Sequence, residues 1–142
     1  MNLRVIWSYC LYTWGGLHRY FGNQNSMTSE YERAVHYFNR SYEVNPVFTY
    51  ARLQKAIILG RELHRYDESL AEFDAYLEEE PNDYRALMNK GLVLQEYGRF
   101  PEALDCLEQY LSLPETREHD PEIRRIAGYL REIVAETKDN DN

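Results

Sequence analysis

The sequence repeats a two-helix pattern with a period of about thirty-four residues. The aromatic residues Tyr31, Tyr66 and Phe100 lie 35 and 34 positions apart. Three further columns keep nearly the same offsets: Ala34, Ser69 and Ala103; Phe38, Phe73 and Leu107; and Ser41, Tyr76 and Tyr110. A period of this length that holds two helices is typical of a stacked helical array, in which each helix pair contacts only its neighbours.

The pattern is clearest between residues 84 and 110. Small and apolar residues of its first half recur at the spacing of one helix face: Ala86, Leu87, Gly91 and Leu94. Gly98 breaks this helix, and Pro101 starts a second one at a position where the missing N–H of proline costs nothing. Gly22, Ala56 and Gly91 share one column, which predicts a close approach between the two helices of each pair. Because Ala56 lies ten positions before Tyr66, where the other pairs have nine, we expect one extra residue in the turn at 61–65.

These columns resemble the tetratricopeptide repeat. The resemblance rests on the small residue, the turn aromatic, the Ala or Ser at the helix crossing and the closing prolines Pro46 and Pro81. The step Asn89-Lys90-Gly91 is similar to a frequent step of that family, and about two-thirds of the chain is covered. The resemblance implies an all-α, right-handed solenoid of three helix-turn-helix repeats, at about 15–48, 49–83 and 84–117. It also implies a protein-binding scaffold.

The rest of the chain is read as part of one domain, residues 1–136. Ser29 and Glu32 predict a capping box for a helix over 29–44. Asp120 and Pro121 predict the start of a capping helix over 120–136, after a loop at 113–119. The apolar face expected for that helix is Ile123, Ile126, Ala127, Leu130 and Ile133. Residues 137–142 form a polar stretch that we expect to be a disordered tail.

The segment 3–22 predicts a long first helix with an aromatic stripe. Its apolar part, residues 5–17, is shorter than the roughly 20 residues that cross a bilayer, and no signal-peptide pattern is present. The favoured interpretation packs the stripe on the first hairpin. Two alternatives stay open: residues 3–17 dock at a membrane surface, since Trp and Tyr favour membrane–water boundaries, or they mediate self-association.

Composition and motifs narrow the function. A net charge of −8 without a basic run disfavours nucleic acid as a partner. His18, His36, His64 and His119 are dispersed, and no phosphate loop, nucleophile elbow or metal-binding spacing occurs, so we expect no enzyme activity, no metal and no cofactor. Cys10 and Cys106 lie on predicted apolar faces, which favours free thiols packed as small hydrophobes in a reducing compartment. The expected location is cytoplasmic, or in the alternative peripheral at the inner membrane face.

In a stacked array the first helices line the concave side. The repeat register predicts the following groove residues: Arg19, Tyr20 and Asn23; Tyr50, Leu53, Gln54 and Ile57; and Arg85, Met88, Asn89 and Leu92. An apolar middle with amide and guanidinium groups beside it suits a peptide or helix of a protein partner. Some members of the family hold a carboxylate at a partner's C-terminus. Arg19, Asn23 and Arg85 match that set in kind, whereas Gln54 and Asn89 depart from it.

Overall fold

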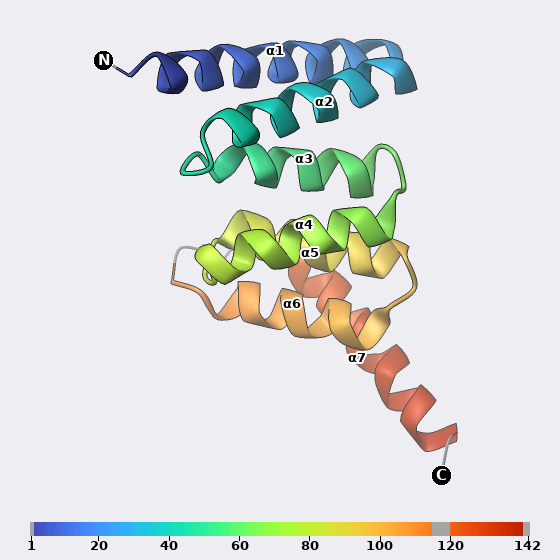
Figure 1. The fold of residues 1–142 in the computed structure, drawn as a ribbon. Coiled ribbons are helices and arrows are strands. Elements are labelled where there is room, and N and C mark those ends of the chain that lie inside the picture. The colour runs from blue at the N-terminus through green and yellow to red at the C-terminus, as the bar shows by residue number, and fades with distance from the viewer. Residues whose placement is uncertain (1, 115–119, 141–142) are drawn as a thin grey trace. The chain divides into compact units, whose positions relative to one another are not determined.

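Helices joined by short turns make up the part of the chain that the computed structural model describes, residues 2–114 and 120–140. No strand occurs in these residues. The helices are α1 (Leu3–Asn25), α2 (Thr28–Val44), α3 (Tyr50–Arg61), α4 (Tyr66–Glu79), α5 (Tyr84–Glu96), α6 (Phe100–Ser112) and α7 (Pro121–Asn140), drawn in Figure 1. The predicted all-α fold of paired helices is therefore confirmed.

The helices group into two compact units, Met1–Glu78 and Glu79–Asn142. In the first unit, the core lies between α2 and α3. Tyr31, Ala34 and Phe38 of α2 form one buried cluster with Ile58 of α3, and the half-buried side chains of Tyr12, Val35 and Leu63 pack against it. Three of these residues belong to columns that repeat along the sequence, which explains why the period predicted the core.

The first hairpin has a different register from the one expected. A Cβ added to Gly22 would lie 2.8 Å from a ring carbon of Tyr31, whereas one added to Gly15 would lie 2.9 Å from the ring of Phe38. In the third hairpin, a Cβ on Gly91 would lie 2.5 Å from Leu107, which is the counterpart of Phe38. Gly15 therefore occupies the place of Gly91, and the expected correspondence of Gly22 with Gly91 is wrong by seven residues.

A second contact supports the corrected register. Ser41 Oγ donates a hydrogen bond to Ser8 O at 2.8 Å, and Ser41 is the counterpart of Tyr110. Tyr110 in turn lies close enough to Tyr84 for that phenol to help raise its pKa. Ser8 and Tyr84 are separated by the same number of residues as Gly15 and Gly91. The first hairpin is thus longer by about one turn in each helix.

The second hairpin contains the expected extra residue. Arg65 N donates to Leu59 O at 2.8 Å across its turn, while in the third hairpin Arg99 N donates to Leu94 O at 2.9 Å. The first link spans six residues and the second spans five. The extra position is accommodated by His64, whose φ of 53° places it in the left-handed region. Gly98, with a φ of 83°, serves the same role in the third hairpin.

The helix starts were predicted with mixed success. The Ser29–Glu32 capping box is wrong: α2 begins at Thr28 after Met27, which makes no side-chain cap bond. Glu32 instead pairs with Arg65 at 2.9 Å. Asp120 does cap α7, since its Oδ1 accepts from Ile123 N at 3.2 Å.

In the second unit, α6 packs between α5 and α7. The buried side chains of α7 are Ile123, Ala127, Leu130 and Val134. Ile133, which was expected in this face, is 37 % exposed. The helix continues to Asn140, so residues 137–140 extend it where a tail was expected. Most of the predicted loop, residues 115–119, lies outside the described residues, as do residues 141–142.

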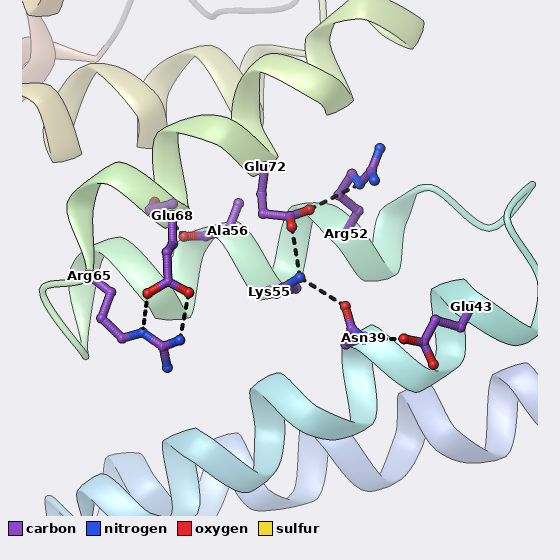
Figure 2. Close-up of polar contacts among 9 residues, drawn as sticks. Asn39, Glu43, Arg52, Lys55, Ala56, Arg65, Glu68 and Glu72 are labelled. Atoms are coloured by element: carbon purple, nitrogen blue, oxygen red, sulfur yellow. Dashed lines mark hydrogen bonds and ion pairs between the residues drawn. The ribbon is translucent and has the colours of Figure 1, made fainter.

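A polar network joins α2, α3 and α4 within the first unit (Figure 2). Lys55 Nζ donates to Glu72 Oε1 at 2.7 Å and to Asn39 Oδ1 at 2.8 Å. Arg52 Nε lies 3.0 Å from the other oxygen of Glu72, and its guanidinium stacks over the Tyr42 ring at 4.2 Å. Because these groups are mostly shielded from water, the network fixes how the first repeat meets the second.

Candidate functional site

The predicted groove residues of the first unit come from α1 and α3, and one pair of them meets. Arg19 of α1 donates a hydrogen bond to the side-chain oxygen of Gln54 on α3, thirty-five residues away. Gln54 is only 8 % exposed. The guanidinium therefore lies over the junction of the two helices, held by an amide that is itself buried.

The other predicted residues of this unit divide by exposure. Leu53 and Ile57 are buried, so their side chains are not available to a ligand. Tyr20 and Asn23 are exposed. Asn23 Oδ1 accepts a hydrogen bond from Tyr31 OH at 3.0 Å. Asn23 thus lies near the turn between α1 and α2, in the part by which the first hairpin is longer than the third. Tyr50 is half-buried at the start of α3.

An aromatic cluster that the sequence reasoning missed lies beside Tyr50. The Tyr12 ring is 6.0 Å from that of Tyr50 and 5.1 Å from that of Phe48, and the Tyr9 ring is 4.7 Å from that of Phe48. The corrected register explains this cluster, because Tyr12 and not Arg19 is the counterpart of Leu53. The sequence did contain a usable signal, since Gly15 also offers a small residue for the crossing with α2.

In the second unit the predicted residues lie along α5. Arg85 pairs with Asp83 at 2.8 Å, and its guanidinium lies 5.7 Å from the centre of the Tyr84 ring. The Asn89 amide donates to Arg85 O at 2.8 Å within the helix and is 7 % exposed. Met88 and Leu92 are half-buried. Of the predicted groove residues on α5, the partly accessible ones are therefore an arginine and two flexible apolar side chains.

The matches to a carboxylate-binding set do not survive the corrected register. The places assigned to Arg19 and Asn23 are held by Tyr12 and Gly16, which carry no positive charge. Arg19 and Arg85 are also engaged by Gln54 and Asp83. In the first unit, the matched positions therefore offer an aromatic ring and the Gln54 amide, and neither is a cation that could pair with a carboxylate.

The side of α1 that faces α2 carries a different group of polar and aromatic residues. His18 Nδ1 lies 2.7 Å from Glu30 Oε2, and the His18 ring stacks on Tyr37 with centroids 5.2 Å apart. The hydrogen bond with His18, aided by Arg33, holds the pKa of the Glu30 carboxyl below its ordinary value. Trp14 contacts the edge of the Tyr37 ring at 5.6 Å. These contacts attach α1 to α2 at the surface.

Two expectations about α1 are wrong. Its aromatic stripe is not buried against the hairpin: the buried residues of α1 are Ser8, Leu11, Gly15 and Gly22, while Trp7 and Trp14 are more than half exposed. Cys10 is exposed as well, whereas Cys106 is half-buried, and both are free thiols. The small residues on the buried face let the backbone of α1 approach α2 closely, which leaves the large side chains outside.

Residues 2–114 and 120–140 contain neither a bilayer-spanning helix nor a cluster of metal ligands. None of the helices there combines the length and apolar character needed to cross a bilayer. Those residues also bring together no group of three or more His, Cys, Asp or Glu side chains that could hold a metal ion.

With this geometry, the fold is similar to that of solved tetratricopeptide-repeat domains. The Arabidopsis OM64 TPR domain superimposes with a TM-score of 0.74 at 16 % identity, covering 91 % of this chain and 98 % of that one. The first TPR of Spaghetti (RPAP3), bound to an HSP90 peptide, gives a TM-score of 0.67 at 14 % identity and covers 87 % and 95 % of the two chains.

In sequence, the chain is similar to Sperm-associated antigen 1 of Rattus norvegicus. The two are 28 % identical over 121 residues, which is 84 % of this chain. The matched region is 12 % of that much longer relative. No protein-family model matches the chain.

Proposed function

We propose that the chain is a non-enzymatic scaffold that binds a peptide or helix of another protein along the first helices of its repeats. The observation that carries this proposal is the aromatic cluster of Tyr9, Tyr12, Phe48 and Tyr50, which lies along the junction of α1 and α3. Partly exposed aromatic rings bind apolar side chains with little loss of conformational entropy. A protein with the same fold, Spaghetti (RPAP3), is described as bound to an HSP90 peptide.

The predicted groove residues take two roles in this proposal. The accessible ones contact the ligand: Arg19, Tyr20, Asn23, Tyr50, Arg85, Met88 and Leu92. The buried ones do not contact the ligand and belong to the packed interior beneath this surface: Leu53, Gln54, Ile57 and Asn89. Such a surface favours a segment with apolar anchors and backbone groups that accept from amides. Because Arg19 and Arg85 are already engaged, the terminal carboxylate of the ligand contributes little.

Capture of partners from native lysate tests the proposal. The test variant combines Tyr20→Ala with Met88→Glu, which changes one exposed and one half-buried groove residue. The matched control is Tyr129→Ala on α7, where the tyrosine is 60 % exposed and Tyr20 is 56 % exposed. We expect the double variant to lose the captured protein while the control retains it, with unchanged helical circular dichroism in both. Equal capture by both variants contradicts the groove.

A further inference from the structure

Six side chains form an exposed stripe along α1, which we call the outer stripe. They are spaced alternately by four and three positions: Leu3, Trp7, Cys10, Trp14, Leu17 and Phe21. This alternation keeps them on one side of the helix and is the spacing with which one helix packs along another. Figure 1 shows α1 at the edge of its unit, with α2 on one side only.

The charges of α1 argue against a lipid surface as the occupant. Helices that lie on membranes bind anionic lipid through several Lys and Arg side chains beside the apolar face. The basic side chains of α1 are Arg4, His18 and Arg19, and two of these bond to Glu30 and Gln54. The net charge of −8 adds repulsion from an anionic membrane.

The distribution of charge favours a second copy of the chain as the occupant of the outer stripe. A net charge of −8 makes two copies repel each other over most of their surface. The segment Leu3–Asn25 contains no Asp or Glu, so two α1 helices can meet without bringing acidic groups together. The outer stripe is also neutral and apolar, which makes it complementary to itself. We infer that two copies of the chain associate through their outer stripes, with the two α1 helices antiparallel.

Side-chain volumes select the antiparallel arrangement. Residues whose numbers add to 24 then face each other, so that Trp7 meets Leu17 of the second copy and Cys10 meets Trp14 of the second copy. Every layer combines a larger with a smaller side chain, as dense packing requires. A parallel pair would instead place each tryptophan against itself and bring the two Arg4 side chains together.

The available area is sufficient for a specific dimer. Half-exposed tryptophan, phenylalanine and leucine side chains each offer on the order of 100 Å². The six positions on each copy therefore give a symmetric pair roughly 1,200 Å² of buried surface, the lower end for specific interfaces. The dimer does not depend on the proposed peptide binding, because Tyr12 and Arg19 lie on another face of α1, toward α3.

Light scattering of the full chain after size exclusion tests the association. At about 100 μM chain, well above a micromolar Kd, we expect twice the monomer mass of 17.0 kDa. The double variant Trp7→Glu, Leu17→Glu should raise the Kd by about a thousandfold or more and give monomer at this concentration, because the pair would bury four unpaired carboxylates. Tyr129→Glu on α7 is the control and should remain dimeric. A monomeric wild-type chain overturns the proposal.

Two further measurements fix the occupant and the orientation. Vesicles of phosphatidylcholine with one-third phosphatidylserine should not carry the chain upward in flotation, and co-flotation that requires Trp7 and Leu17 overturns the second-copy assignment. In a Cys106→Ser background, Trp14→Cys should form a disulfide-linked dimer with Cys10 on mild oxidation, while Thr13→Cys should not. The single variant Cys106→Ser, which retains only Cys10, is the comparison. If it forms the disulfide-linked dimer as fast as the variant with Trp14→Cys, the antiparallel register is wrong.

Discussion

At the scale of single residues, Asp120 joins α6 to α7. Its Oδ2 accepts from Tyr110 OH at 3.0 Å, and its Oδ1 caps the first turn of α7. Burial of the phenol, together with the carboxylate of Asp120, raises the pKa of Tyr110 to about 12. Tyr110 is thus kept neutral in the folded chain at pH values where an unfolded tyrosine has already begun to ionise.

This raised pKa predicts a loss of stability at alkaline pH. The stabilising effect is complete below the ordinary tyrosine pKa of 10.0 and is lost as the pH rises from there to about 12, because the unfolded chain releases the proton first. Tyr110→Phe should remove this part of the decline and cost about 1 kcal/mol at neutral pH, since Asp120 loses a donor. Urea unfolding at pH 7 and pH 11 measures both effects. Tyr129→Phe serves as the exposed control, and an alkaline decline that Tyr110→Phe leaves unaltered contradicts the account.

Single residues also explain which parts of the fold the sequence could predict. The sequence period correctly predicts that Ala34 and Phe38 are buried, because the residues of these columns make the contacts that each repeat needs. The crossing with α1 was misplaced because Gly15 and Gly22 are both small and lie two turns apart, on nearly the same side of the helix. Helical spacing alone does not show which of the two glycines crosses α2 at Phe38. That depends on the length of the hairpin, which the sequence period does not determine.

At the scale of helices, the network around Glu72 predicts how the first unit responds to mutation. Glu72→Ala would leave Lys55 and Arg52 without their shared carboxylate in a mostly buried position. We expect a loss of about 1–3 kcal/mol in the free energy of unfolding, as for other buried polar groups deprived of a partner.

The matched control for Glu72 is Glu108→Ala. Glu108 pairs with Arg131 at 2.9 Å, but both side chains are about half exposed. Its loss should therefore cost less than about 1 kcal/mol. Urea unfolding followed by tryptophan fluorescence for Glu72→Ala and by circular dichroism for both variants measures the difference. Similar losses in the two variants would mean that the network around Glu72 contributes no more than a surface ion pair.

Helices also show the limit of pattern reading. The sequence predicted the position of every helix, since apolar spacing and turn residues determine it. It did not predict that α1 buries Ser8 and Gly15 and exposes Trp7 and Trp14. From sequence, an aromatic stripe predicts a buried face. In the structure, small residues of α1 make the closest approach to α2. Which face of α1 is buried therefore depends on the shape of the neighbouring helix.

At the scale of the whole molecule, two compact units give different unfolding signals. Both tryptophans, Trp7 and Trp14, lie in α1 of the first unit, whereas circular dichroism follows all the helices. Gly91→Val places a branched side chain where even a Cβ would be 2.5 Å from Leu107 in the second unit. We expect it to destabilise that unit by about 2 kcal/mol through overpacking.

The two probes should therefore respond unequally to Gly91→Val. The midpoint measured by circular dichroism should fall clearly, and the midpoint measured by tryptophan fluorescence should fall by less than half as much. The control is Gly128→Ala in α7, where a Cβ meets nothing within 4 Å and helix propensity rises. Equal shifts of both midpoints would show that the chain unfolds as one cooperative body.

The lengthened first hairpin has a consequence for how such arrays vary. The extra residues add about one turn to each helix, and a whole turn returns the side chains of that helix to the same angular positions. The pairing of Gly15 with Phe38 therefore survives in a hairpin that reaches further than its neighbours. A repeat can thus grow outward in whole turns and present new surface at its tip while its interior stays unchanged.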